Sequence, residues 1–200
     1  MKIRTMAAAA LALAAVLTLA GCASTGGPGP DIMPGMDHGS GATSSEAAAD
    51  FNNADVMFGM MMIPHHEQAI GMADTILAKD DIDEQVVTLA EGIKAAQHPE
   101  IDQMESWLDE WGADMPDMDG MGHGGGMMSD DDMTALQDAT GAEASRLFLE
   151  QMITHHEGAI EMAQDEVDDG QNADMVELAQ NIIESQTAEI ATMQELLAQL

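Results

Sequence analysis

Aromatic, basic and thiol side chains are scarce in this sequence. Of its 200 residues none is tyrosine, aromatic residues make up 2%, five are lysine or arginine, and one is cysteine. A single cysteine excludes a disulfide within the chain. Five basic residues against 37 acidic ones give a net charge of −32, which makes nucleic acids and anionic lipid surfaces poor partners. The same charge attracts cations without selecting among them, and a solvated acidic surface explains it equally well.

Long hydrophobic runs are also missing, apart from one stretch near the N-terminus. The stretch from Ala7 to Ala20 carries no charge and follows two basic residues. It is shorter than the roughly 20 apolar residues of a membrane-spanning helix and is typical of a secretory signal. Leu19-Ala20-Gly21-Cys22 matches the processing site of a bacterial lipoprotein. We therefore predict a signal peptide over residues 1–21, with Cys22 either lipidated or, as the less favoured alternative, an ordinary thiol.

The rest of the chain divides into a tether and a repeated domain. Residues 22–49 consist mainly of Gly, Pro, Ser and Ala without a hydrophobic period, so we predict a flexible tether. After it, the segment from Met62 to Ala73 returns in similar form from Met152 to Ala163, and residues 90–104 are echoed by residues 179–193. Two similar units therefore make up residues 50–200.

Each unit shows the pattern of a helical hairpin. Apolar side chains and histidines recur three and four residues apart, as on one broad face of a helix. In the first unit these are Phe58, Met62, His65, Ala69 and Met72, and in the second Phe148, Met152, His155, Ala159 and Met162. A second helical pattern follows in each unit after a short acidic connection, at Asp80-Asp81 and at Asp168-Asp169-Gly170. Short connections favour antiparallel neighbours.

The two hairpins are expected to pack on each other, because one hairpin alone cannot cover its apolar face. We predict an all-α, four-helix bundle with hairpin 1 at residues 50–112, a Met- and Gly-rich linker at 113–133, and hairpin 2 at 134–200. Pro64 and Pro99 fall inside the helical patterns, so we expect a kink, a local break or the start of a helix at each.

The repeated motifs supply the first candidate metal site. Neutral imidazole and thioether groups both bind copper. The candidate ligands are His65, His66, His155, His156, Met62 and Met152. Buried imidazoles also need polar partners, and Gln97, Glu100, Gln186 and Glu189 face the same interior. A hydrogen-bonded polar cluster that fixes the register of the helices therefore stays open as the alternative.

Methionine supplies the second candidate site. The chain has 20 methionines, and thioethers are soft ligands for Cu(I) and Ag(I) that remain usable where thiols are oxidised. Glycine-rich segments let closely spaced ligands wrap a soft ion. The candidates are Met115, Met118, Met121, His123, Met127 and Met128 in the linker and Met33, Met36 and His38 in the tether. We expect the linker methionines to be solvated, without a packing role. The alternative is that these segments drifted to a low-complexity composition and bind no ligand.

The sequence gives no support for a calcium-binding loop or for a catalytic motif. Met115 stands where an EF-hand loop needs its first acid. No thiol remains after lipidation, and no serine lies in a recognisable nucleophile elbow. A di-iron site asks for Glu-x-x-His twice, but Met62, Ile63, Met152 and Ile153 stand three residues before the four histidines. We therefore expect the protein not to be an enzyme.

The first unit resembles a bacterial domain-of-unknown-function family, number 305. The resemblance rests on Met62-Ile63-Pro64-His65-His66-Glu67, Gln97, Glu100-Ile101, Met104 and Trp107-Leu108. The second unit is similar, but it has Thr154 where the first has proline, and it lacks the Trp-Leu ending. The resemblance implies a ferritin-like four-helix bundle and a role in copper handling, since the family includes CopM-type periplasmic copper-binding proteins.

These features together predict an exported lipoprotein of the cell envelope, anchored through its lipid on the extracytoplasmic face of a membrane. It would bind copper, as Cu(I) or Cu(II), or Ag(I), for sequestration, delivery or resistance, and the sequence does not identify a protein partner. An acidic structural or interaction lipoprotein without metal is the alternative. A di-iron oxidase on the same fold is less favoured.

Overall fold

The computed structural model describes residues 50–113 and 125–200, and all regular structure in these ranges is helical. Its elements are α1 (Asn53–Leu77), α2 (Glu84–Trp111), α3 (Asp130–Asp138), α4 (Gly141–Asp169) and α5 (Ala173–Leu197). The predicted signal peptide, Cys22 and the tether lie outside the described residues. Among the described helices, none combines the length and the apolar character needed to cross a membrane.

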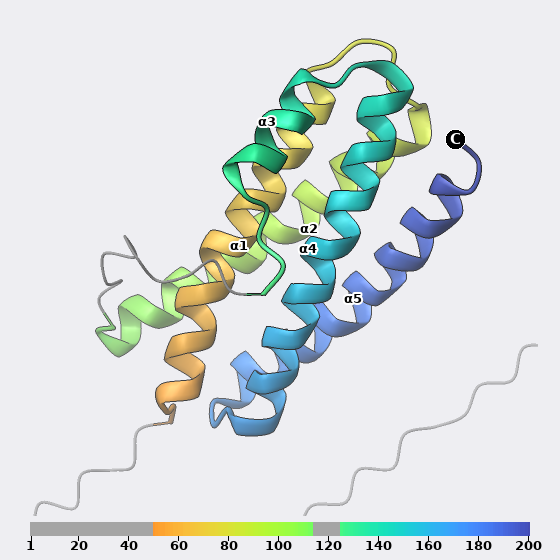
Figure 1. Cartoon of the computed structure of the whole chain (residues 1–200). Helices are drawn as coiled ribbons and strands as arrows, with labels where there is room; N and C mark the ends of the chain where they lie inside the picture. Colours follow the sequence, from red (N-terminus) through yellow and green to blue (C-terminus); the bar gives the residue numbers. More distant parts are fainter. Residues whose placement is uncertain (1–49, 114–124) are drawn as a thin grey trace, which may run out of the picture. The chain divides into compact units, whose positions relative to one another are not determined.

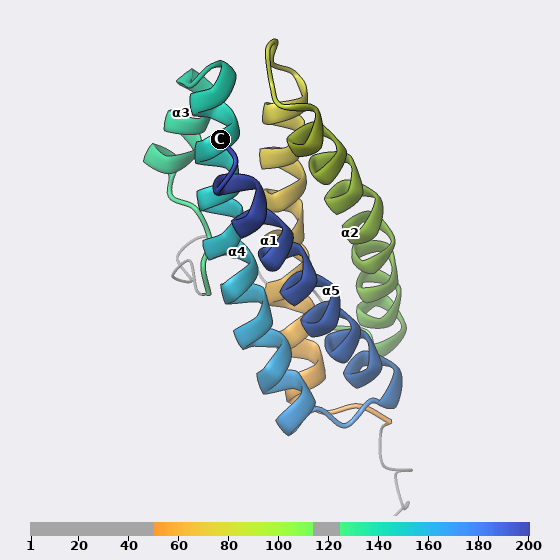
Figure 2. The same ribbon diagram turned by 90° about the vertical axis from the view of Figure 1, so that its right-hand side faces the viewer.

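The four long helices form two antiparallel hairpins, α1–α2 and α4–α5, as predicted from the repeat (Figures 1 and 2). The hairpins meet mainly through α1 and α4, whereas α2 and α5 touch only over a small area. The helices that carry the paired-histidine motifs are therefore the central pair of the bundle. The predicted all-α bundle is confirmed.

A buried carboxylate ties the start of α1 to the α4–α5 turn. Asp55 is fully buried, and its side chain accepts the backbone N–H groups of Asn52 at 2.5 Å, Gln171 at 3.0 Å and Asn172 at 2.8 Å. The Asn52 side chain caps α1 and also donates to the Asp169 carbonyl at 2.8 Å. The side chains of Asn52 and Asp55 thus both cap α1 and contact the α4–α5 turn, which holds the two hairpins together at this end.

Two of the three structures expected at the prolines do not occur. Both α1 and α2 run through Pro64 and Pro99 without interruption, so neither a break nor the start of a helix occurs at either residue. Each proline removes one helical N–H, and the long flanking segments of helix hold the backbone in place. The packing of the flanking turns therefore outweighs the local cost of the proline.

The structure also differs from the predicted linker over residues 113–133, because α3 begins at Asp130. Ser129 caps this helix in a capping box with Asp132, and three aspartates in the first turn suit the positive end of the helix dipole. α3 packs against α1 and α4 and buries Leu136. A nine-residue helix with one buried position leaves almost no periodic signal, which is why the sequence did not reveal it.

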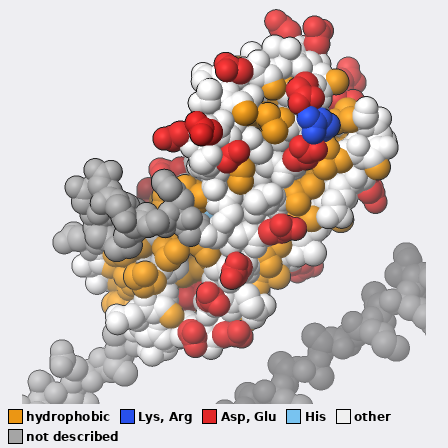
Figure 3. Space-filling view, in the orientation of Figure 1, with side chains coloured by type: hydrophobic (Ala, Val, Ile, Leu, Met, Phe, Trp, Pro, Cys, Tyr) orange, Lys and Arg blue, Asp and Glu red, His pale blue; other side chains and the backbone are white. Residues whose placement is uncertain are grey.

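The core consists of two hydrophobic clusters with polar side chains between them. One cluster contains Ile76 and Phe148, and the other contains Phe58 and Met104. Several methionines are fully buried: Met62, Met72, Met104, Met152, Met175 and Met193. Core filling therefore accounts for part of the methionine content. Acidic side chains are spread over the outer surface (Figure 3).

Candidate metal centre

The four motif histidines come together in the middle of the bundle, where α1 crosses α4. None of them is more than 1% exposed. The rings of His65 and His155 lie with their centroids 3.7 Å apart at a tilt of 41°. Met62 and Met152, one helical turn earlier on each helix, are fully buried. The sequence therefore correctly placed the two histidine pairs and both methionines in the core.

Two of the histidines are held by carboxylates from the partner helices. His66 Nε2 bonds Glu100 Oε2 of α2 at 2.8 Å, and His156 Nε2 bonds Glu189 Oε2 of α5 at 2.6 Å. The two bonds occupy equivalent places in the repeat. Since a carboxylate accepts the bond, Nε2 carries a proton, and Nδ1 is the nitrogen left to face the interior of the cluster. Such a partner orients a metal-binding imidazole and raises its basicity.

The other two histidines are neutral. His65 Nε2 donates to the Gly125 carbonyl at 2.8 Å. Burial lowers the pKa of His65 to about 4, against the opposing effect of the Gly125 bond, and the nearby His66 and His156 lower it further. Burial, together with the other three histidines, holds the pKa of His155 well below its usual value. Both imidazoles are therefore in the form that binds metals at neutral pH.

Several buried polar atoms in this cluster have no hydrogen-bond partner among the described residues. They are Nδ1 of His65, His66 and His156, both ring nitrogens of His155, both amide atoms of Gln97, and Oε1 of Gln186. A buried polar group without a partner costs about 1–3 kcal/mol. Unpartnered imidazole nitrogens beside buried thioethers form a donor set that fits copper or silver.

The imidazoles alone do not form a preformed metal cage. Within residues 50–113 and 125–200, no three His, Cys, Asp or Glu side chains are arranged to hold a metal ion. A metal at this cluster would therefore need the thioethers of Met62 and Met152, or a small movement of the rings. The hydrogen-bonded polar cluster considered from the sequence stays open.

A short segment, Gly125–Met128, covers the histidine cluster, and we call it the strap. The amide of Gln68 accepts the Met128 N–H at 2.7 Å and donates to the Met128 carbonyl at 2.9 Å. On α4, a Cβ atom at Gly158 would lie 1.6 Å from the Gly125 carbonyl oxygen. Gln68 and Gly158 hold the same position in the two repeats. At this shared position the first repeat has a side chain that hydrogen-bonds the strap, and the second repeat has a glycine that leaves room for the strap backbone.

The strap corrects the prediction made for the linker methionines. Met128 is only 8% exposed and belongs to the hydrophobic core, so the expectation that it is solvated is wrong. Met127 is half-buried. The cause is the bond pair from Gln68, whose role no local sequence pattern reveals. The other candidates, Met115, Met118, Met121, His123, Met33, Met36 and His38, lie outside the described residues.

Comparison with known proteins identifies the family. The model of the domain of unknown function DUF305 matches residues 55–197. A DUF305 protein from Streptomyces coelicolor, whose name proposes that it is secreted, is 35% identical over 76% of this chain and 95% of its own, with a TM-score of 0.68. A DUF305 fragment from Deinococcus radiodurans is 30% identical over 74% of this chain and 98% of its own, with a TM-score of 0.66.

CopM in its Cu(II)-bound form is 33% identical over 72% of this chain and 96% of its own, with a TM-score of 0.63. CopM structures with Cu(I) and with Ag also match. A comparison with curated proteins gives no match. The fold, the paired-histidine repeat and these matches together show that the chain belongs to the DUF305 family.

Proposed function

We propose that this protein is a non-enzymatic, lipid-anchored protein of the cell envelope that binds copper, and silver in its place. The histidine cluster with Met62 and Met152 is the proposed binding site. Sequestration, delivery and metal resistance are the roles that such a binder serves. Metal ions are its proposed ligands, and the membrane is contacted through the lipid on Cys22.

The unpartnered imidazole nitrogens carry this proposal. Among the residues that the structure describes, none is a hydrogen-bond partner for Nδ1 of His65, His66 and His156 or for either ring nitrogen of His155. Two carboxylates fix the ring orientation of His66 and His156 from outside, as in many metal sites. CopM, which shares 33% of its residues with this chain, binds Cu(I), Cu(II) and Ag. The donor chemistry and the relative thus point to the same ions.

The envelope location follows from the N-terminus and agrees with the ligand chemistry. The charged start, the apolar run and the Leu-Ala-Gly-Cys site are features of exported lipoproteins. The Streptomyces relative carries a name that proposes secretion. Thioether ligands suit such a compartment, because thiols there are lost to oxidation.

A competition titration with Cu(I) under anaerobic conditions tests the proposal on the mature protein. We expect binding tighter than about micromolar, and a variant with His65, His66, His155 and His156 changed to Gln should lose the tightest equivalent. His98→Gln is the matched control, because His98 is exposed on α2. An affinity weaker than micromolar for the unaltered protein contradicts the proposal.

A purely structural polar cluster is the second candidate, and it is favoured because residues 50–113 and 125–200 hold no three His, Cys, Asp or Glu side chains arranged around a metal. Unfolding of the parent protein and the four-histidine variant, each with and without Cu(I), separates the two. Stabilisation by Cu(I) that disappears in the variant supports ligation. An equal loss of stability in both conditions supports the structural cluster.

A further inference from the structure

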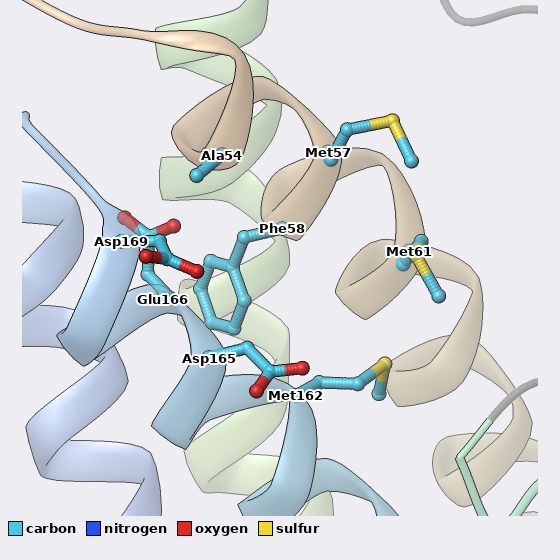
Figure 4. A pocket seen from close by; sticks show the side chains of 8 residues that line it. All are labelled: Ala54, Met57, Phe58, Met61, Met162, Asp165, Glu166 and Asp169. Carbon is cyan, nitrogen blue, oxygen red and sulfur yellow. The ribbon is translucent and has the colours of Figure 1, made fainter.

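A pocket of about 210 Å³ lies between the first half of α1 and the second half of α4, away from the histidine rings. Thioethers and carboxylates line it, with Met57 and Met61 from α1 and Met162 and Glu166 from α4 (Figure 4). Its sulfur atoms are not part of the predicted sites. The pocket therefore needs an explanation of its own.

The three methionines reach the surface of the bundle, unlike the fully buried methionines of the core. Met57 and Met61 are one helical turn apart, so their side chains share a face of α1. Met57 is 47% exposed, and Met61 and Met162 are half-buried, with Met162 packed against the cluster that contains Phe58 and Met104. Figure 4 shows Met57 and Met61 on one side of Phe58, Glu166 and Asp169 on its other side, and Asp165 beside Met162. Thioethers that reach the surface remain available for a soft ion.

Glu166 is the buried acid of the pocket. It is 2% exposed and lines the pocket, and burial together with its hydrogen bond to the Asp55 side chain raises the pKa of its carboxyl to about 8. Asp165 and Asp169 add negative charge at the same wall. A cation in the pocket would be attracted by the acidic side chains of Asp165 and Asp169.

The ligand types select the cation. Carboxylates alone would favour hard ions such as Ca²⁺ or Mg²⁺, which thioethers bind poorly. Three neutral thioethers suit a monovalent soft ion, since the nearby acids then balance its single charge. Met61 also precedes His65 by one turn of α1, and a Cβ atom at Gly125 of the strap would lie 3.5 Å from the Met162 sulfur. The pocket therefore adjoins both the strap and the approach to the histidine cluster.

We propose that this pocket is a second metal site, which takes Cu(I) or Ag(I) through the sulfur atoms of Met57, Met61 and Met162, with Asp165 and Asp169 supplying the counter-charge. The site does not depend on metal binding by the histidines. It gives the surface of the bundle a sulfur-only entry point beside a mixed imidazole and thioether core.

Methyl NMR of the mature protein labelled with methyl-¹³C methionine tests this site residue by residue. On titration with Ag(I), the methyl signals of Met57, Met61 and Met162 should shift together, with the same dependence on added Ag(I), and saturate. Mg²⁺ at the same concentration should leave them in place. Signals assigned to these three residues that stay unmoved by Ag(I) overturn the proposal.

The same spectra separate this proposal from the proposed function. Shifts of Met62 and Met152 without shifts of the pocket methionines would support the histidine cluster and overturn the pocket site. Shifts of the pocket methionines alone would support the pocket site and count against the core. Each outcome therefore decides the two sites independently.

A triple variant, Met57→Leu with Met61→Leu and Met162→Leu, gives the second measurement. Leucine nearly conserves the volume of methionine but removes the sulfur, so the fold should be kept. The number of tightly bound Ag(I) ions should fall by one. Met133→Leu is the matched control, because Met133 is partly buried on α3 and packs against the core. An unchanged stoichiometry in a triple variant with an unchanged circular dichroism spectrum overturns the proposal.

Discussion

Gly158 lies so close to Gly125 that a Cβ atom on it would fall 1.6 Å from the Gly125 carbonyl oxygen and 2.6 Å from the Gly126 nitrogen. The backbone of the strap thus rests directly on the backbone of α4. The same Gly125 carbonyl accepts the bond from His65 Nε2. The glycine on α4 therefore determines how one histidine of the cluster is held.

Gly158→Ala should displace the strap. No flexible side chain can move aside, because the clash is with backbone atoms. We expect a loss of about 1–3 kcal/mol in the free energy of unfolding, measured by urea denaturation, and faster exchange of the Met128 amide. Gly71→Ala is the control, because nothing lies within 4 Å of its added Cβ atom. That change should stabilise α1 by about 0.5–1 kcal/mol, since alanine favours a helix. Equal effects of the two substitutions would show that the strap does not press on α4.

Gln68→Ala should release the other side of the strap. The Met128 N–H and carbonyl would both lose their partner, although the helix itself would be unaffected. We expect a loss of about 1–2 kcal/mol in the free energy of unfolding. Hydrogen exchange of the Met128 amide should rise more than that of any amide in α5. Protection of Met128 that is unchanged in this variant would exclude Gln68 as its anchor.

The repeat and its helical period were sufficient to predict the four long helices and the burial of the histidines. His65, His66, His155 and His156 recur with apolar residues at helical spacing, and this pattern permits one inward face. The carboxylate partners were foreseeable for the same reason, because Glu100 and Glu189 stand at equivalent positions in the second helices. Local spacing within a helix is thus enough to predict which face turns inward.

The strap and the pocket could not be predicted in this way. The contact of Gln68 with Met128 joins segments far apart in the chain, and Gly158 shows its role only beside Gly125. The only sequence signal was the difference between Gln68 and Gly158 at equivalent repeat positions. Likewise, Met61 and Met162 face each other only because α1 and α4 pack as they do. Contacts between distant segments can be identified only once the fold is known.

Glu100→Gln tests how the outer carboxylates act on the histidines. Glutamine can still accept the bond from His66 Nε2, but it removes the negative charge that raises the basicity of the ring. We expect the affinity of the histidine cluster for Cu(I) to fall by about 10–100-fold, measured by competition with a chelator. Glu105→Gln is the control, because Glu105 is exposed on the same helix.

A readout without metal separates positioning from a structural effect. In the parent protein, ¹⁵N NMR of His66 should show the proton on Nε2, and in Glu100→Gln the two tautomers should become mixed. Glu189→Gln should do the same to His156, its partner at 2.6 Å. Affinity that is equal in Glu100→Gln and Glu105→Gln would remove Glu100 from the proposed site.

Glu166 should make the stability of the bundle depend on pH. Burial raises the pKa of this carboxyl from 4.5 to about 8, and the nearby Asp55 adds to the rise. Between these two values the folded state holds a proton that the unfolded state has lost. The free energy of unfolding therefore decreases as the pH rises through this window, by up to about 1.4 kcal/mol per pH unit.

Glu166→Gln should remove this dependence, since a neutral amide is as easily buried at pH 8 as at pH 5. The stability of the variant relative to the parent should therefore increase with pH, measured by urea denaturation at several values between 5 and 8.5 in the absence of metal. Glu157→Gln, an exposed position on the same helix, should give a difference that does not change with pH. A constant difference for Glu166→Gln would mean that the Glu166 carboxyl is ionised in the folded protein, with its charge balanced by a group other than those described at the pocket.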